Sequence, residues 1–153
     1  MDSYLSIVAD IKTRLEALDA GRVHDYERQA ADPAKFISLF RHANRILGWE
    51  ISRRAVPEHV AGVHFRHHQM VLRGYMGLED AAATSKQFQV LIDRVCAAFR
   101  TNTTPPGVSW QYRNGDVPQN APAQVEVIDD RMFGAVLCHH AQIALSVTER
   151  IIV

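Results

Sequence analysis

The chain has 153 residues, 47% of them apolar, which is enough for one domain with a sizeable core. Its 17 basic and 17 acidic side chains give a formal net charge of zero. This balance argues against a general nucleic-acid binder or a ligand of anionic membranes, because both need a basic excess. From the length we expect a single domain over 1–153, of the α+β class that its predicted elements indicate. From the charge balance we expect no membrane partner and no specific nucleic acid.

Cysteine content and the N-terminal residues favour a reducing compartment. Two cysteines, Cys96 and Cys138, are too few for a disulfide scaffold in a chain of this length. The first residues lack the basic start and apolar run of a signal peptide, and no stretch approaches the roughly 18 apolar residues of a membrane helix. We expect a cytoplasmic protein with two free thiols that are mostly buried.

Three segments have the apolar spacing of amphipathic helices. The first covers 3–20 and stops at Gly21. The second covers 33–47, because Asp32 can cap a helix whose first residue is Pro33, and Gly48 ends it. The third covers 80–100 and begins at Asp80. Its expected buried stripe consists of Phe88, Leu91, Ile92, Val95 and Phe99.

Alternation of apolar and polar residues predicts the strands. Residues 22–28 indicate a short strand or an extended link. The runs 49–56 and 63–78 predict a hairpin, with a break at Pro57. Shorter alternating runs follow at 108–112 and 124–128, and the pair Asp129–Asp130 after them is typical of a turn.

The closing stretch, 131–153, is the longest alternating run. One set of alternate residues is apolar except for His139, and the other becomes polar toward the end. At about 3.3 Å per residue this run could span roughly 60 Å, far beyond a usual strand. We expect it to bend at Gly134 or to reach past its own domain. Together these elements predict an α+β fold: a mainly antiparallel sheet, about three helices packed on one face, and a long C-terminal strand.

Histidines on two predicted strands are the main candidates for a metal site: His64, His67 and His68 on one, His139 and His140 on the other. Adjacent strand residues point to opposite faces, so neither adjacent pair can easily share a metal. A site would need His64 and His68 together with one histidine of the other strand. No nearby acid or cysteine completes such a set convincingly, although Cys138 shares a face with His140. We expect polar residues of a sheet or interface, with no bound metal and no cofactor.

No catalytic constellation stands out either. Cys96 lies in an apolar helix stripe, and Cys138 is adjacent to His139, so their strand side chains diverge and suit proton transfer poorly. Glu79–Asp80 is best explained as a helix start. The sequence contains no Gly-x-Ser-x-Gly, phosphate loop or Gly-rich dinucleotide turn. A small cytoplasmic enzyme or metal-binding protein that uses the five histidines remains the alternative function, and a plain dimer with a regulatory or chaperone role is a third.

Several pieces, in this order, carry a resemblance to a known family. They are Val-His-Asp-Tyr-Glu-Arg at 23–28, Gly-Trp-Glu-Ile-Ser-Arg at 48–53, Leu-Arg-Gly-Tyr-Met-Gly-Leu-Glu-Asp-Ala at 72–81, Arg-Met-Phe-Gly-Ala-Val-Leu-Cys-His at 131–139 and Leu-Ser-Val-Thr-Glu-Arg at 145–150. The succession resembles small phage and prophage minor tail proteins of the tail-terminator, tail-completion or head–tail joining kind. None of the pieces is a chemical motif.

The resemblance implies an α+β fold with helices against an antiparallel sheet. It also implies a structural protein that assembles as a ring, often a hexamer, and caps the tail tube or joins it to the head. Its partners would be copies of itself, the tail tube and head–tail connector proteins, and it would reside in the virion tail after assembly in the host cytoplasm. The family supplies no catalytic residues. A neutral chain with a long strand and no active-site pattern fits a subunit that acts by binding itself.

Overall fold

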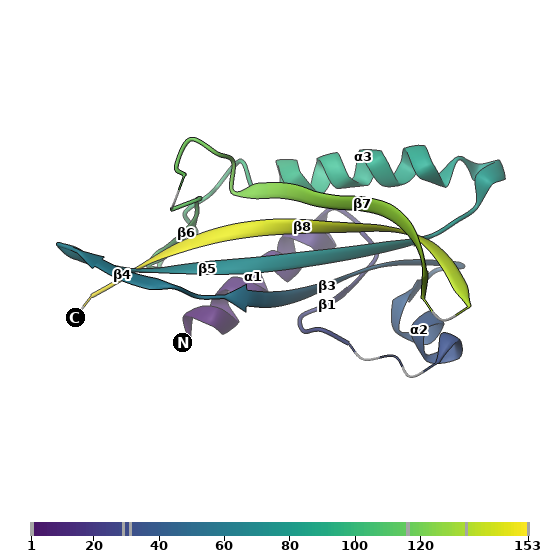
Figure 1. Ribbon diagram of the computed structural model, residues 1–153, viewed down its shortest axis with the longest axis horizontal. Coiled ribbons are helices and arrows are strands. Elements are labelled where there is room, and N and C mark those ends of the chain that lie inside the picture. The colour runs from purple at the N-terminus through teal and green to yellow at the C-terminus, as the bar shows by residue number, and fades with distance from the viewer. Residues whose placement is uncertain (1, 29, 31, 116, 134, 153) are drawn as a thin grey trace.

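A curled sheet of eight strands organises the chain in this computed structural model, which describes residues 2–28, 30, 32–115, 117–133 and 135–152 (Figure 1). The central order is β1-β3-β5-β8-β6; β2 pairs with β3, β4 with β5, and β7 with β8. The strands are β1 (Arg22–His24), β2 (Arg41–His42), β3 (Arg45–Ala55), β4 (Glu58–Ala61), β5 (Val63–Gly77), β6 (Trp110–Tyr112), β7 (Ala123–Phe133) and β8 (Val136–Ile151).

The pairing of β5 with β8 runs through the centre of this sheet. Their antiparallel register extends from His64 opposite Ile151 to Gly77 opposite Cys138 without a shift. The expected long strands and the antiparallel hairpin from β3 to β5 are confirmed. The described strand pairs are antiparallel apart from β1, which runs parallel to β3. The α+β prediction is therefore confirmed.

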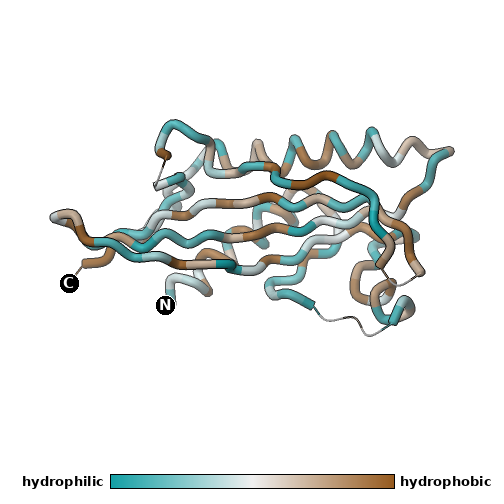
Figure 2. Tube along the Cα trace, viewed as in Figure 1, coloured by the Kyte–Doolittle hydropathy of each residue, from teal (hydrophilic) through white to brown (hydrophobic). Residues whose placement is uncertain are grey.

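The two faces of the sheet are covered differently. Helices α1 (Ser3–Ala17) and α3 (Thr84–Ala97) pack on one face and form the main core with it. Helix α2 (Pro33–Phe40) packs near one end of the opposite face, where Phe36 and Phe40 meet Tyr75 and Cys138 (Figure 1). The expectation that all three helices pack on one face is therefore wrong, because the aromatic side chains of α2 pack on alternate residues of the same strands. Apolar and polar residues alternate along the long strands, as Figure 2 shows, because each strand serves both faces.

A glycine makes room for the largest residue of the main core. Trp49 on β3 is fully buried and lies directly opposite Gly74 on β5. A Cβ atom at Gly74 would lie 2.6 Å from Cη2 of the Trp49 ring, closer than real Cβ contacts occur. Position 74 therefore requires glycine for steric reasons, although its backbone lies in an ordinary strand.

The second helix is shorter than the sequence predicts. It begins at Pro33 as expected, with the Asp32 carboxylate accepting a hydrogen bond from the Lys35 N–H, but it ends at Phe40 instead of 47. Ala43, with φ +55°, lies between β2 and β3, and the chain returns at once as a strand. Leu47 is buried opposite Met76, so tertiary pairing overrides the helical apolar spacing there.

Two further predictions are wrong: the start of the third helix and the turn at Asp129–Asp130. The third helix begins at Thr84, after a 3₁₀ turn at Asp80–Ala82, and Asp80 does not cap it. Asp129 and Asp130 are not a turn: they lie within β7, opposite His140 and His139. Strand β7 thus continues to Phe133, and β8 begins at Val136. The bend expected at Gly134 lies outside the described residues.

Leu91 and Val90 provide a matched test of the main core. Leu91 on α3 is 6% exposed, whereas its neighbour Val90 is 59% exposed. Leu91→Ala should lower the free energy of unfolding by about 2–5 kcal/mol, because it removes buried methyl groups and leaves a cavity. Val90→Ala should change it by no more than about 0.5 kcal/mol. Urea denaturation of the two variants measures both values, and equal losses would contradict the assigned helix face.

Candidate functional site

The two groups of strand histidines lie far apart. His68 on β5 stands opposite Val147, whereas His139 and His140 on β8 stand opposite Met76 and Tyr75. Eight residues of β5 separate the two groups, or about 26 Å. The three-histidine site that would combine both strands is therefore geometrically excluded. Among the described residues, no group of three or more His, Cys, Asp or Glu side chains could hold a metal ion.

His68 lies near one end of the paired strands β5 and β8, which we call the ladder, and its side chain forms buried hydrogen bonds. Its Nε2 lies 2.9 Å from Oε1 of Glu149, which also accepts a hydrogen bond of 3.1 Å from the Ser3 hydroxyl. Burial lowers the pKa of His68, and the Glu149 carboxylate opposes that shift. This network links the start of α1 to β5 and β8. Its geometry is that of a structural contact within the core.

The projecting β4–β5 hairpin holds the other histidines of that end. His59 and His67 stack with ring centroids 4.8 Å apart, and His67 Nε2 lies 3.0 Å from His59 Nδ1. On the other face of the hairpin, His64 Nε2 lies 3.2 Å from a carboxylate oxygen of Glu58. These contacts hold the two strands of the hairpin together.

A hydroxyl, an imidazole and a carboxylate form a chain at the other end of the ladder. His139 Nε2 lies 2.8 Å from the Thr84 hydroxyl, and its Nδ1 lies 2.6 Å from Asp130 Oδ1. Such a chain can activate a hydroxyl nucleophile. Thr84, however, is 3% exposed, and its hydroxyl also bonds to the backbone N–H and carbonyl of Glu79. The chain therefore fastens the start of α3 to β7 and β8.

Cys138 and His140 lie on the opposite face. His140 Nδ1 lies 2.9 Å from Asp129 Oδ1, and burial lowers the pKa of this histidine. Cys138 is fully buried in the aromatic cluster beneath α2, and burial raises the pKa of its thiol to about 11. A thiol with this pKa is protonated at neutral pH and is a poor nucleophile. Cys96 is buried on α3, as expected.

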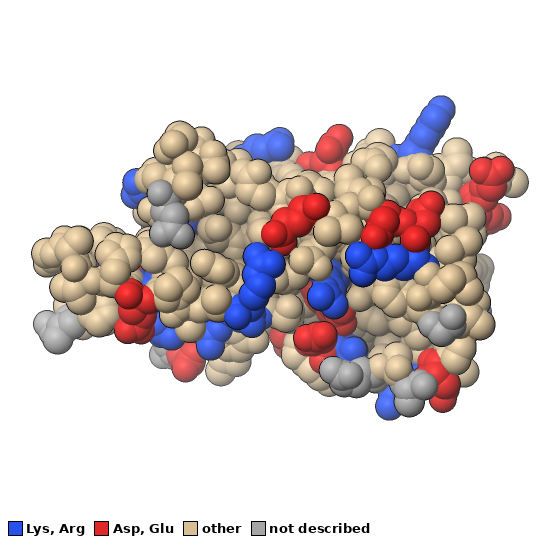
Figure 3. Space-filling view, viewed as in Figure 1, with Lys and Arg blue, Asp and Glu red and all other residues tan. Residues whose placement is uncertain are grey.

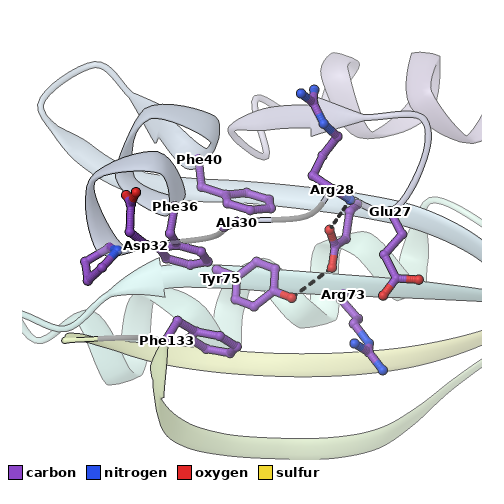
Figure 4. A pocket seen from close by; sticks show the side chains of 11 residues that line it. Glu27, Arg28, Ala30, Asp32, Phe36, Phe40, Arg73, Tyr75 and Phe133 are labelled. Carbon is purple, nitrogen blue, oxygen red and sulfur yellow. Dashed lines mark hydrogen bonds between the residues drawn. The ribbon is translucent and has the colours of Figure 1, made fainter.

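Helix α2 and the loop before it enclose a pocket of about 410 Å³ on this face (Figure 4). Its aromatic wall consists of Phe36, Phe40, Tyr75 and Phe133, and its charged lining of Glu27, Arg28, Asp32, Glu50 and Arg73.

Glu50 lies at the inner end of this pocket and is only 4% exposed. Its carboxylate accepts hydrogen bonds from the Tyr75 hydroxyl at 2.9 Å and from the Arg28 backbone N–H at 3.1 Å. Burial raises the pKa of Glu50 above its ordinary value of 4.5, and the two hydrogen bonds and the charge of Arg73 only partly offset this rise. Phe36 and Phe133, which flank Tyr75, stack with centroids 5.2 Å apart.

Exposed apolar side chains mark the two ends of the sheet. We call the residues at the β7–β8 end the tip: Met132 and Leu137 lie opposite each other there and are 58% and 43% exposed. We call the depression at the other end the hollow: it has a volume of about 700 Å³, and Val63, Phe65, Val108, Trp110, Arg150 and Ile152 contribute to its lining. In Figure 3, Arg, Lys, Asp and Glu side chains gather over the middle of the visible face, and the projecting end at the left is mostly uncharged.

No described helix is long and apolar enough to cross a membrane. No family model matches the chain, and no curated protein matches it in sequence. The function must therefore be argued from the resemblance and from the geometry above.

Sequence reasoning missed Glu50, Tyr75 and Thr84. Glu50 and Tyr75 come from different strands, and only the register of β3 and β5 brings them together. One signal was present in the sequence. Glu50 lies between two large apolar residues, Trp49 and Ile51, which are both buried, so its own side chain points to the opposite face of the strand. For Thr84 we find no signal, since its partners lie on distant strands.

Replacement of Glu50 by glutamine tests its burial. In the unfolded chain this carboxyl ionises near 4.5, and in the folded chain at a higher pH, so the folded state binds the proton more tightly. Its contribution to stability is thus present below pH 4.5 and is lost as the pH rises through the folded pKa. Glu50→Gln cannot ionise. Urea denaturation at a series of pH values should show the variant gaining stability relative to wild type as the pH rises, and a pH-independent difference would contradict the raised pKa.

Proposed function

We propose that the chain is a structural subunit of a phage or prophage tail. It associates head to tail with copies of itself into a ring at the tail end and performs no catalysis. The resemblance supplies the biological setting, with a tail terminator or a head–tail joining protein as the nearest kind. The observation that carries self-association is the pair of unlike apolar features, tip and hollow, at opposite ends of one rigid sheet.

Their shapes and positions support a contact between unlike surfaces. The tip is the end of a strand pair that exposes two apolar side chains and the hollow is a depression with apolar residues in its lining, so one can enter the other in the next copy. The β5–β8 ladder holds them about 43 Å apart, which prevents the tip from reaching the hollow of its own chain. A contact between two different patches repeats with each added subunit and closes into a ring when the rotation allows.

Charge supports the same pairing. Arg150 lines the hollow. Asp130 on β7 lies on the same face as Met132, two residues away, and its side chain is more than half exposed. Insertion of the tip would bring this carboxylate toward the arginine. The occupant of the hollow is therefore a second copy of this chain, and the tail tube and head–tail connector proteins would bind the ring that results.

The alternative, an enzyme or metal-binding protein based on the histidines, is less well supported. It requires His64 and His68 to act with His139 or His140, which the register separates by about 26 Å. The hydrogen-bonded partners of His68 and His139 give each a role in fastening a helix to the sheet.

Two single-ended variants test the head-to-tail contact. Met132→Asp with Leu137→Asp places charges on the tip, and Ile152→Asp places one at the hollow. Each variant alone should remain monomeric in sedimentation velocity at protein concentrations where wild type assembles. An equimolar mixture should form a heterodimer and stop there, because one intact tip can meet one intact hollow.

Val90→Asp is the matched control, since Val90 is about as exposed as Met132 but lies on the outer face of α3. It should assemble like wild type. The proposal fails if the end variants assemble as wild type does, if the mixture stays monomeric, or if wild type is monomeric even at millimolar concentration.

A further inference from the structure

The pocket beneath α2 contains a buried carboxyl group, Glu50. Both hydrogen bonds to Glu50 come from neutral groups, the Tyr75 hydroxyl and the Arg28 backbone N–H. Arg73 stands opposite Glu50 in the register of β3 and β5, and its positive charge opposes the rise that burial causes in the Glu50 pKa, but among the described residues no salt bridge joins the two. A buried carboxylate without a salt-bridged counter-ion is costly, and a cation that enters the pocket would reduce that cost.

The aromatic wall next to Glu50 adds a second attraction for cations. Phe36 and Phe133 stack with an interplanar angle of 5°, and Tyr75 meets them edge-on at 5.5 and 4.8 Å. Ring faces attract ammonium and guanidinium groups, most strongly where water is excluded. A carboxylate beside several aromatic rings is thus the chemistry that recognises an organic cation with an apolar stem.

Two arginines, Arg28 and Arg73, line the same pocket. Arg28 stacks over Tyr26 at 4.8 Å and approaches His24 Nδ1 at 3.3 Å. Figure 4 shows the Arg28 guanidinium pointing away from Tyr75, whereas Arg73 lies near the Tyr75 hydroxyl, and its charge opposes the rise that burial causes in the pKa of that group. Glu27 and Asp32 also line the pocket, so its lining carries three acidic and two basic side chains.

We propose that this pocket binds an organic cation, an alkylguanidinium or alkylammonium group, with its charged head on Glu50 and its stem along Phe36 and Phe133. The cation is either a free small molecule or an arginine or lysine side chain of a neighbouring copy. The pocket faces the side of the sheet opposite α1 and α3. It adjoins the tip through Phe133, but Met132 and Leu137 do not line it, and it shares no lining residue with the hollow. The proposal therefore does not depend on the ring.

Calorimetric titration with n-butylguanidinium tests the site, and n-butylurea serves as a neutral probe of similar shape. Wild type should bind n-butylguanidinium saturably in the millimolar range or tighter and should bind n-butylurea at least tenfold more weakly. Binding should strengthen as the pH rises, because burial raises the pKa of Glu50 and ionisation creates the partner of the cation.

Three variants assign the binding to named residues. Glu50→Gln should weaken the affinity at least tenfold, and its amide can still accept from the Arg28 N–H and donate to the Tyr75 oxygen. Phe133→Leu keeps an apolar wall but removes a ring face, and it should weaken the affinity about threefold. Asp93→Asn removes an exposed acid from α3 and should leave the affinity unchanged.

The proposal is overturned by any of three results: no saturable binding of n-butylguanidinium to wild type, equal affinity for n-butylurea, or equal losses of affinity in Glu50→Gln and Asp93→Asn.

Sedimentation of Glu50→Gln then distinguishes the source of the cation. Normal self-association of this variant means a free molecule. Loss of self-association with a thermal midpoint no lower than that of wild type means a side chain of a neighbouring copy. Failure of the tip and hollow variants would leave the titration result standing, so the two proposals fail separately.

Discussion

The unbroken ladder between β5 and β8 is the constraint on which the rest of the structure depends. Because its register never shifts between His64 and Gly77, the positions of both ends are fixed relative to each other. The same register places His68 beside Glu149 and separates it from His139, so the five strand histidines act as local fasteners of helices and hairpins. It also holds the tip and the hollow apart, so the proposed contact between them would have to join two chains.

Because the helices cover its two faces unequally, the sheet carries a core on one face and a pocket on the other. Helices α1 and α3 cover one face around Trp49, whose ring fits only because Gly74 has no side chain. The next residue, Glu50, points to the other face, where α2 covers one end and leaves an aromatic pocket. Core and pocket are thus built from alternate residues of the same strands. A rigid main core on one side holds the pocket residues in place on the other.

Apolar periodicity predicted the elements that depend on local pattern: the existence of three helices, the β3–β5 hairpin, the α3 stripe and the long C-terminal strand. It failed where distant pairing decides. Residues 45–47 have helical spacing, yet Leu47 joins a strand because Met76 stands opposite it. Asp129 and Asp130 suggested a turn, yet His140 and His139 provide hydrogen bonds that allow two acids within a strand. Glu50 and Tyr75 lie 25 residues apart in sequence, so their pocket could not be read from either segment alone.

Assembled virions test most directly whether the chain forms part of a phage tail end. Virions should be assembled in cells with and without the gene for this chain, and their tails examined by electron microscopy and by mass spectrometry of purified particles. We predict several copies of the chain per virion at one end of the tail, and tails of abnormal length or without heads when the gene is absent. Virions that contain no copy of the chain, together with normal tail length and normal head joining in its absence, would contradict the account.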